Sequence, residues 1–137
     1  MTTEENILRR QQKNWNFNMV VNTNAFMHVN KIHPLKQKEV AEIVDAAKKD
    51  DAVSGVIIFG SATRYDCDID SDLDVCIDWK NECYDDEGVL KPFTRNMYKV
   101  IIKVTKGNVD IINKEDLPDT YLTEAVQQGV VVYEQNV

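Results

Sequence analysis

Residues 56–78 read VIIFGSATRYDCDIDSDLDVCID, an apolar run that ends at Gly60-Ser61 and is followed by aspartates alternating with apolar residues. The apolar run predicts a buried strand, and the alternation from Leu73 onward predicts a second strand with one polar face. Side chains two residues apart in a strand share a face, so Asp72 and Asp74 would lie together with their α-carbons roughly 6.6 Å apart. Two carboxylates placed in this way can bind a pair of divalent metal ions.

Length and composition describe a single globular domain. The chain has 137 residues, of which 43% are hydrophobic and 28% are charged, as in an ordinary protein with one core. No apolar stretch approaches the roughly 18 residues that a membrane span needs. The polar N-terminus lacks the apolar segment of a secretory signal. We therefore expect a cytoplasmic protein without membrane contact.

The charge balance is acidic, with 23 aspartates and glutamates against 16 lysines and arginines and a formal net charge of -7. Such a charge repels a phosphate backbone, so nucleic acid is not expected as a partner. Many acids lie between Asp66 and Asp86, where the excess fits a metal site as well as a solvated loop. The three cysteines, Cys67, Cys76 and Cys83, lack zinc-binding spacing and are expected to be reduced thiols.

Helical and extended patterns alternate along the chain. Helices are expected from Pro34 to about Lys49, from Pro92 to Lys106 with Gly107 as its cap, and from about Asp119 to Gln128 with Gly129 following. Strands are expected at Val53–Phe59, Leu73–Trp79, Val109–Ile112 and Val130–Tyr133. This alternation predicts an α/β or α+β fold, a small mixed sheet flanked by helices, over residues 35–137. Residues 1–34 are expected to form an N-terminal extension that is helical in parts.

The Gly60-Ser61 dipeptide follows the first strand directly. Glycine carries no side chain and a following turn presents free N–H groups, so a phosphate can approach the backbone there. Gly-Ser turns are also common in proteins that bind no phosphate. The dipeptide gains meaning from Asp72 and Asp74, because phosphate donors and metal ligands would then meet at neighbouring strand ends.

A third acid, Asp110, lies between Val109 and Ile111 in a short apolar run. A carboxylate in such a run is costly to bury unless it is paired or binds a metal ion. If its strand lies beside that of Asp72, three carboxylates could hold two Mg²⁺ ions about 3.5 to 4 Å apart. The alternative interpretation is a solvent-facing residue on an edge strand.

These motifs together resemble the DNA polymerase beta-like nucleotidyltransferase superfamily, and most of all its minimal members and the corresponding domain of kanamycin nucleotidyltransferase. The family pattern is a hydrophobic strand, Gly-Ser, a short spacer, two acids alternating with apolar residues, and a later strand with one more acid. Here the segments are VIIFGS, ATRYDCDIDS, DLDV and VDII. The C-terminal LTEAVQQGVVVYE is also similar to the minimal members, so the resemblance spans roughly Leu35 to Glu134.

The resemblance implies the nucleotidyltransferase fold and transfer of a nucleoside monophosphate from a nucleoside triphosphate (NTP) to a hydroxyl group. ATP is the expected donor, and pyrophosphate would leave. Asp72 and Asp74 would bind both of two Mg²⁺ ions, and Asp110 would complete one metal site and help to deprotonate the acceptor. Positioning and charge neutralisation would supply most of the catalysis.

The phosphate-binding side of the resemblance lies in the loop after the first strand. Gly60 and Ser61 would hold the triphosphate, and Arg64 would contact a phosphate or be an ordinary surface arginine. Many minimal members have glycine directly after this arginine, whereas this chain has Tyr65, which adopts a positive φ only at a cost. Tyr65 would therefore cover the nucleotide site or pack elsewhere, with the loop on a different path.

The partner is also implied by the resemblance alone. Minimal members often act beside a helical partner protein, including as antitoxins that nucleotidylate their toxin, so the acceptor hydroxyl is expected on a partner. One alternative is a non-catalytic nucleotide-binding or antitoxin subunit that only binds a helical partner; Tyr65 favours it and the intact acids oppose it. Another is a modifier of aminoglycoside-type small molecules. Formation of a homo-oligomer is compatible with all three.

Overall fold

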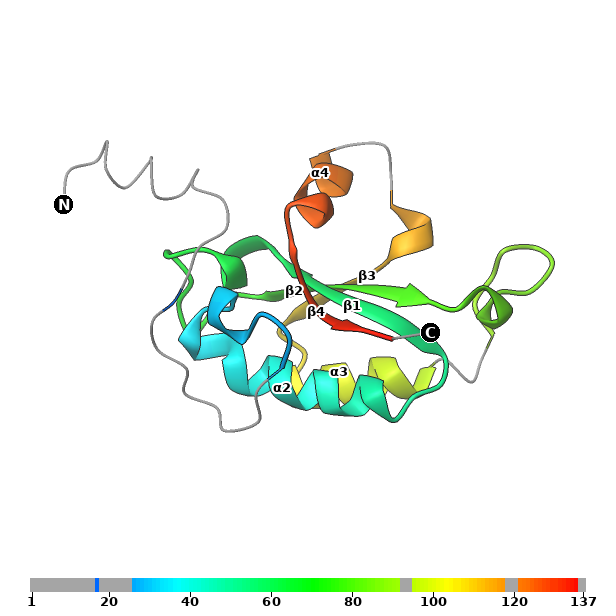
Figure 1. Ribbon diagram of the computed structural model, residues 1–137, viewed down its shortest axis with the longest axis horizontal. Coiled ribbons are helices and arrows are strands. Elements are labelled where there is room, and N and C mark those ends of the chain that lie inside the picture. The colour runs from blue at the N-terminus through cyan, green and yellow to red at the C-terminus, as the bar shows by residue number, and fades with distance from the viewer. Residues whose placement is uncertain (1–16, 18–25, 92–94, 118–120, 136–137) are drawn as a thin grey trace.

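Four strands form one mixed sheet in the computed structural model, which describes residues 17, 26–91, 95–117 and 121–135 (Figure 1). The strands are β1 (Val53–Phe59), β2 (Leu73–Trp79), β3 (Val109–Asn113) and β4 (Val130–Glu134), in the spatial order β3-β2-β1-β4. β1 is antiparallel to both β2 and β4, whereas β2 and β3 are parallel. The prediction of a small mixed sheet flanked by helices is confirmed.

Helices lie on both faces of this sheet (Figure 1). α2 (Pro34–Lys48) and α3 (Arg95–Thr105) run side by side on one face, and the shorter α4 (Tyr121–Gln127) lies on the other. Single 3-10 turns occur at Val29–Lys31, Gly60–Thr63, Asn81–Cys83 and Lys114–Asp116. No helix in the described ranges is long and apolar enough to cross a membrane.

The two central strands have the bounds that their patterns predict. Leu73, Val75, Ile77 and Trp79 of β2 are all buried under α2 and α3. The opposite face carries Asp74, Cys76 and Asp78, and of these only Cys76 is fully buried, in a second cluster with Phe59 and Val126 beneath α4. The alternation of β2 therefore separates one core face from one face that is partly polar. All three cysteines are free and buried, as expected.

The helix ends follow their sequence signals with one correction. α2 starts at Pro34, and the His33 side chain caps it by accepting a hydrogen bond from the Leu35 N–H at 3.2 Å. α3 ends in a motif where the Gly107 N–H bonds to the Ile102 carbonyl at 2.9 Å. The left-handed position directly after the helix belongs to Lys106, with φ 56°, and Gly107 comes next with φ 82°. The prediction that Gly107 directly caps the helix is therefore corrected by one residue, since Lys106 lies between the helix end at Thr105 and Gly107.

Three of the expected features lie outside the described residues. These are the helical extension before residue 26, the start of the second helix at Pro92, and the start of the last helix at Asp119. The last helix is described from Tyr121 and ends at Gln127, two residues before Gly129.

Gly129 joins α4 to β4 at a point where another backbone comes close. A β-carbon at this position would lie 2.8 Å from the Ile58 carbonyl oxygen and 2.9 Å from Cγ2 of Ile57. We expect Gly129→Ala to lower the free energy of unfolding by about 1 to 3 kcal/mol, because β1 must shift to admit the methyl group. Urea unfolding measures this loss, and a variant as stable as the wild type would show that the connection adjusts freely.

Candidate active site

Three acids meet at one end of the sheet. The parallel pairing of β2 and β3 places Asp74 opposite Asp110, and Asp72 immediately precedes β2. The last residue of β1, Phe59, pairs with Asp74 from the other side, so Gly60 follows directly beside that carboxylate. The strand of Asp110 therefore lies where a three-carboxylate site requires it, and Asp110 is exposed on an edge strand of the described sheet.

The carboxyl group of Asp74 is the electrostatic centre of this cluster. Desolvation first, and then the charges of Asp110 and Asp72, raise its pKa to about 6, and a side-chain hydrogen bond with Asp110 adds to the increase. The positive charge of Arg64 acts in the opposite direction. Repulsion between neighbouring carboxylates disfavours full ionisation, so a proton or a cation is favoured at this point.

The donor set suits magnesium in its chemistry. Carboxylate oxygens are the ligands that Mg²⁺ prefers, and a divalent ion would remove the repulsion that raises the pKa of Asp74. Among the described residues, no group of three Asp, Glu, His or Cys side chains is already arranged to hold one ion. The side chains of Asp72 and Asp110 are exposed, so they can rotate toward Asp74. Magnesium binding stays a prediction.

Gly60 allows the turn to pass close to Asp74. Its φ is +74°, and a β-carbon built there would lie 2.1 Å from Oδ2 of Asp74. The backbone then forms the single turn Gly60–Thr63, in which the Thr63 hydroxyl donates to the Gly60 carbonyl at 2.8 Å. The Ser61 hydroxyl donates to the Asp72 carbonyl at 3.4 Å. The Gly-Ser dipeptide and the acids therefore form one connected unit, as the sequence predicts.

The loop beyond this turn carries Arg64 and Tyr65 at the surface. Arg64 pairs with Asp66 at 3.5 Å, and both side chains are more than a third exposed. Because its charge also lowers the pKa of Asp74, Arg64 lies within electrostatic reach of the acids. Tyr65 is 51% exposed, so it is not a core residue.

Sequence reasoning missed Asn108, which fixes the loop just before the acids. Its side-chain amide donates to the backbone carbonyls of Asp70 and Ser71 at 3.2 and 3.3 Å. Its backbone carbonyl accepts a hydrogen bond from the Leu73 N–H at 3.1 Å. Asn108 precedes β3 by one residue, so these bonds connect β3 to the entry of β2. An asparagine before a short strand carries no local signal for contacts nearly forty residues away.

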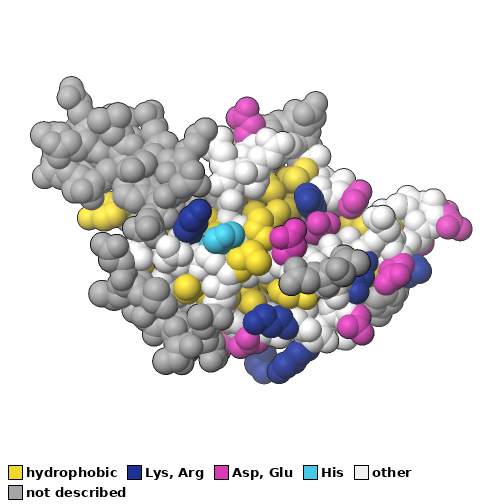
Figure 2. All heavy atoms as spheres, viewed as in Figure 1, with side chains coloured by type: hydrophobic (Ala, Val, Ile, Leu, Met, Phe, Trp, Pro, Cys, Tyr) yellow, Lys and Arg dark blue, Asp and Glu magenta, His cyan; other side chains and the backbone are white. Residues whose placement is uncertain are grey.

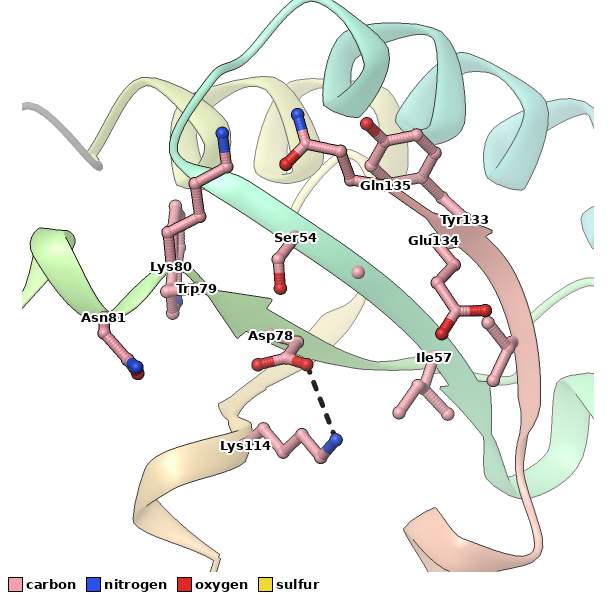
Figure 3. A pocket seen from close by; sticks show the side chains of 12 residues that line it. Ser54, Ile57, Asp78, Trp79, Lys80, Asn81, Lys114, Tyr133, Glu134 and Gln135 are labelled. Atoms are coloured by element: carbon pink, nitrogen blue, oxygen red, sulfur yellow. Dashed lines mark hydrogen bonds and ion pairs between the residues drawn. The ribbon is translucent and has the colours of Figure 1, made fainter. Parts of the chain in front are cut away.

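The same sheet face has a different character at its other end. Asp78 pairs with Lys114 at 3.5 Å, and both line an open cavity of about 560 Å³. Figure 3 shows this ion pair among the side chains that line the cavity. Next to it, an apolar hollow of about 590 Å³ lies between α4 and β4, lined in part by Ile57, Leu117 and Val131. On the side of the molecule that Figure 2 shows, hydrophobic side chains gather near the centre with charged side chains beside them. Asp78 therefore does not join the three acids.

Removing one neighbour tests the coupling of the acids. We expect Asp110→Asn to lower the pKa of Asp74 from about 6, because Asp110 is the largest charged contributor to the increase. A carboxyl-carbon NMR titration in EDTA measures this value. Asp86→Asn, which removes an exposed acid from the loop after β2, serves as the control. An unchanged Asp74 titration in Asp110→Asn would contradict the coupling.

Comparison with known families gives the identity of the fold. The sequence profile described as "Polymerase beta, Nucleotidyltransferase" matches residues 41–137, which include every strand and all three carboxylates. The chain belongs to this nucleotidyltransferase family. The comparison with curated protein sequences finds no match.

Two solved structures are similar to parts of this chain. One is a complex from Shewanella oneidensis of a tri-AMPylated HEPN toxin with an MNT antitoxin, with 16% identity, a TM-score of 0.46, and coverage of 74% of this chain and 71% of the other. The second is a Sulfolobus solfataricus protein described as a candidate nucleotidyltransferase, with 25% identity, a TM-score of 0.45, and coverage of 72% and 79%. Because both TM-scores are low, the family assignment rests on the sequence profile.

Proposed function

We propose that this nucleotidyltransferase is a catalyst that uses Mg²⁺ and an NTP, with ATP as the expected donor, to transfer a nucleoside monophosphate to a hydroxyl group on a partner protein. One observation carries the proposal: Asp74 and Asp110 lie in register on adjacent parallel strands, directly beside the Gly60 turn. The backbone N–H groups that we expect to bind phosphate and the acids that we expect to bind metal would therefore act at the same end of the sheet. Phosphoryl transfer needs this combination because positioning and charge stabilisation dominate its catalysis.

Each residue of the unit has a role in this proposal. The Gly60 turn brings backbone N–H groups to the triphosphate, and the Ser61 hydroxyl and the Arg64 guanidinium bind and orient phosphate oxygens. Asp72 and Asp74 would hold the magnesium ions, and Asp110 would complete one site and accept the proton of the attacking hydroxyl. Bound magnesium would neutralise charge on the phosphates and lower the pKa of the acceptor hydroxyl.

A protein acceptor is favoured by the openness of the site. Asp72 and Asp110 are exposed, so the described part of the chain leaves the reacting end of the sheet open to a large partner. The resemblance to minimal superfamily members favours a helical protein in this role. Exposed carboxylates at a strand end would be accessible to a hydroxyl on a protruding loop or chain end.

The test is a transfer assay with α-³²P-labelled ATP, GTP, CTP and UTP, Mg²⁺, and the product of the neighbouring gene as acceptor. We expect label on the partner with one nucleotide in particular, and none in EDTA. Aminoglycosides form a second acceptor series, and label on them instead would replace the protein acceptor with a small molecule. Calorimetry that detects neither Mg²⁺ nor NTP binding would contradict the catalytic proposal.

The second candidate is a subunit that binds its partner without chemistry. It is favoured by the arrangement of the acids, since no three metal-ligating side chains among the described residues are set to hold one ion. In that case partner binding would be identical in Asp74→Asn and the wild type, and no label would transfer under any condition.

A further inference from the structure

Lys36 is a buried lysine in the first turn of α2, with only 2% of its surface exposed. Lysine is almost never buried to this extent unless an acid pairs with it, because desolvating an ammonium group is costly. Its neighbour on the same helix, Lys38, is exposed and shows the ordinary placement. The burial of Lys36 therefore calls for a compensating interaction.

The compensation within the described chain is small. The ammonium group donates to the carbonyl oxygen of Ile69 at 3.4 Å, although an ammonium has three hydrogens to donate. Within the ranges that the structure describes, no carboxylate forms an ion pair with Lys36; the recorded pairs are Arg64 with Asp66 and Lys114 with Asp78. Among the described residues, the Lys36 ammonium is thus a buried cation with one long hydrogen bond.

Lys36 contacts the loop of residues 64–72, which joins the Gly-Ser turn to Asp72 and β2. Ile69 lies between Ser61 and Asp72, and its side chain is 74% exposed, so the carbonyl is the part of this residue that is held. The start of α2 also contacts the turn itself, because the His33 N–H donates to the Ala62 carbonyl at 2.7 Å. Figure 1 shows the start of α2 next to this loop.

The charge of Lys36 affects one group at the start of α2 and one group in the loop. Burial first and then the Lys36 charge lower the pKa of His33. Burial raises the pKa of the Cys67 thiol, and the Lys36 charge opposes this increase, as do hydrogen bonds with the hydroxyls of Ser71 and Ser61. The ammonium group therefore lies within electrostatic reach of the start of α2 and of the loop that follows the Gly60–Thr63 turn.

We propose that Lys36 is a positioning residue for the nucleotide: its buried ammonium holds the loop through the Ile69 carbonyl and supplies a fixed positive charge beside the loop that follows the Gly60-Ser61 turn. This inference rests on the proposed function, since it requires phosphate at that turn. The loop itself is acidic, with exposed carboxylates at Asp66, Asp68, Asp70 and Asp72. A fixed cation offsets their repulsion of the incoming triphosphate.

A role in nucleotide binding explains why a cation with so little compensation among the described residues is retained. The free protein bears the cost of the buried charge, and the nucleotide, which binds only the folded protein, adds stability that increases with the logarithm of its affinity. Removing the charge should therefore stabilise the free protein or leave it unchanged, while it weakens nucleotide binding. A lysine with a purely structural role would show the opposite pattern, because its removal would lower stability and spare the affinity.

The experiment compares Lys36→Met and Lys36→Gln with the control Lys38→Met, which removes the same charge from an exposed position of the same helix. Three quantities are measured: the melting temperature of the free protein, the Kd of a non-hydrolysable Mg–nucleotide complex by calorimetry, and amide hydrogen exchange of residues 64–72 without nucleotide. Glutamine keeps a donor at this position but no charge, so it also supplies data if the methionine variant does not fold.

We expect both Lys36 variants to raise the Kd by about tenfold or more, with an equal or higher melting temperature, and Lys36→Met to speed exchange in the loop. Lys38→Met should match the wild type in all three. If both Lys36 variants bind nucleotide as tightly as the wild type, the inference is wrong while the proposed function stands. If the wild type itself binds no nucleotide, the proposed function fails and the role of Lys36 fails with it.

Discussion

Asp74→Asn should slow nucleotide transfer by about a thousandfold and at the same time make the free protein more stable. The loss follows from the position of Asp74, which lies opposite Asp110 and in contact with the Gly60 turn. Removing one proposed metal ligand costs several kcal/mol of transition-state stabilisation, which corresponds to a decrease in rate of about a thousandfold. The transfer assay with labelled nucleotide measures this decrease.

The gain in stability follows from the raised pKa of Asp74, which is about 6. The folded protein holds the proton more tightly than the unfolded chain, so the stability of the wild type falls as the pH rises from about 4 to about 6, and the full loss is present once the folded carboxyl has ionised. Asparagine carries no charge and avoids the penalty. Because Asp74 is only half-buried, we expect a gain of about 1 to 2 kcal/mol at pH 7.5 after allowing for solvent screening.

The pH dependence distinguishes this cause from a packing effect. Between pH 6 and pH 4 the Asp74 carboxyl of the wild type becomes protonated, so the difference in unfolding free energy between Asp74→Asn and the wild type should shrink toward zero. Urea unfolding in EDTA at several pH values measures it. Asp78→Asn is the control, since Asp78 pairs with Lys114 instead and should give no gain. If the difference in unfolding free energy stays constant from pH 6 to pH 4, the electrostatic explanation is wrong.

The strands that carry the site could be predicted because their local patterns leave little choice. A one-residue slip of β2 would turn Leu73 and Val75 out of the core and bury aspartates, so the alternation sets both bounds and face. The β-branched run before Gly60 sets β1 in the same way. The position of Asp110 relative to Asp74 is harder to predict. β2 and β3 pair in parallel and the connection between them contains α3, and no local pattern specifies which strand becomes the neighbour of β2.

Lys36 and Asn108 could not be found by the same reasoning. Each acts through carbonyl oxygens more than thirty residues away, at Ile69 and at Asp70 and Ser71. A lysine in a helix is normally assigned to the solvent face, and tertiary packing overrides that assignment here. Sequence patterns therefore identified the groups proposed to act on substrate, whereas the groups that hold the loop depend on tertiary contacts.

Gly60→Ala should have the second large effect, on both stability and transfer. Its φ of +74° is unfavourable for alanine, and the new methyl group would lie 2.1 Å from Oδ2 of Asp74. Backbone strain of about 1 kcal/mol and the steric conflict of about 1 to 3 kcal/mol both lower the free energy of unfolding. The Asp74 carboxylate must also move away from the turn, so we expect transfer to fall by at least about a hundredfold.

Gly88→Ala separates the two causes. Gly88 has a similar φ of +80°, but a β-carbon there meets nothing within 4 Å, so its substitution reports backbone strain alone. The additional loss in Gly60→Ala then measures the conflict with Asp74. In an Asp74→Ala background this additional loss should disappear, because the conflicting oxygen is gone, and the double-mutant cycle gives the coupling energy directly. If Gly60→Ala lowers the free energy of unfolding equally with and without the Asp74 side chain, Gly60 is needed only for the backbone conformation of the turn. Its closeness to Asp74 would then have no part in forming the site.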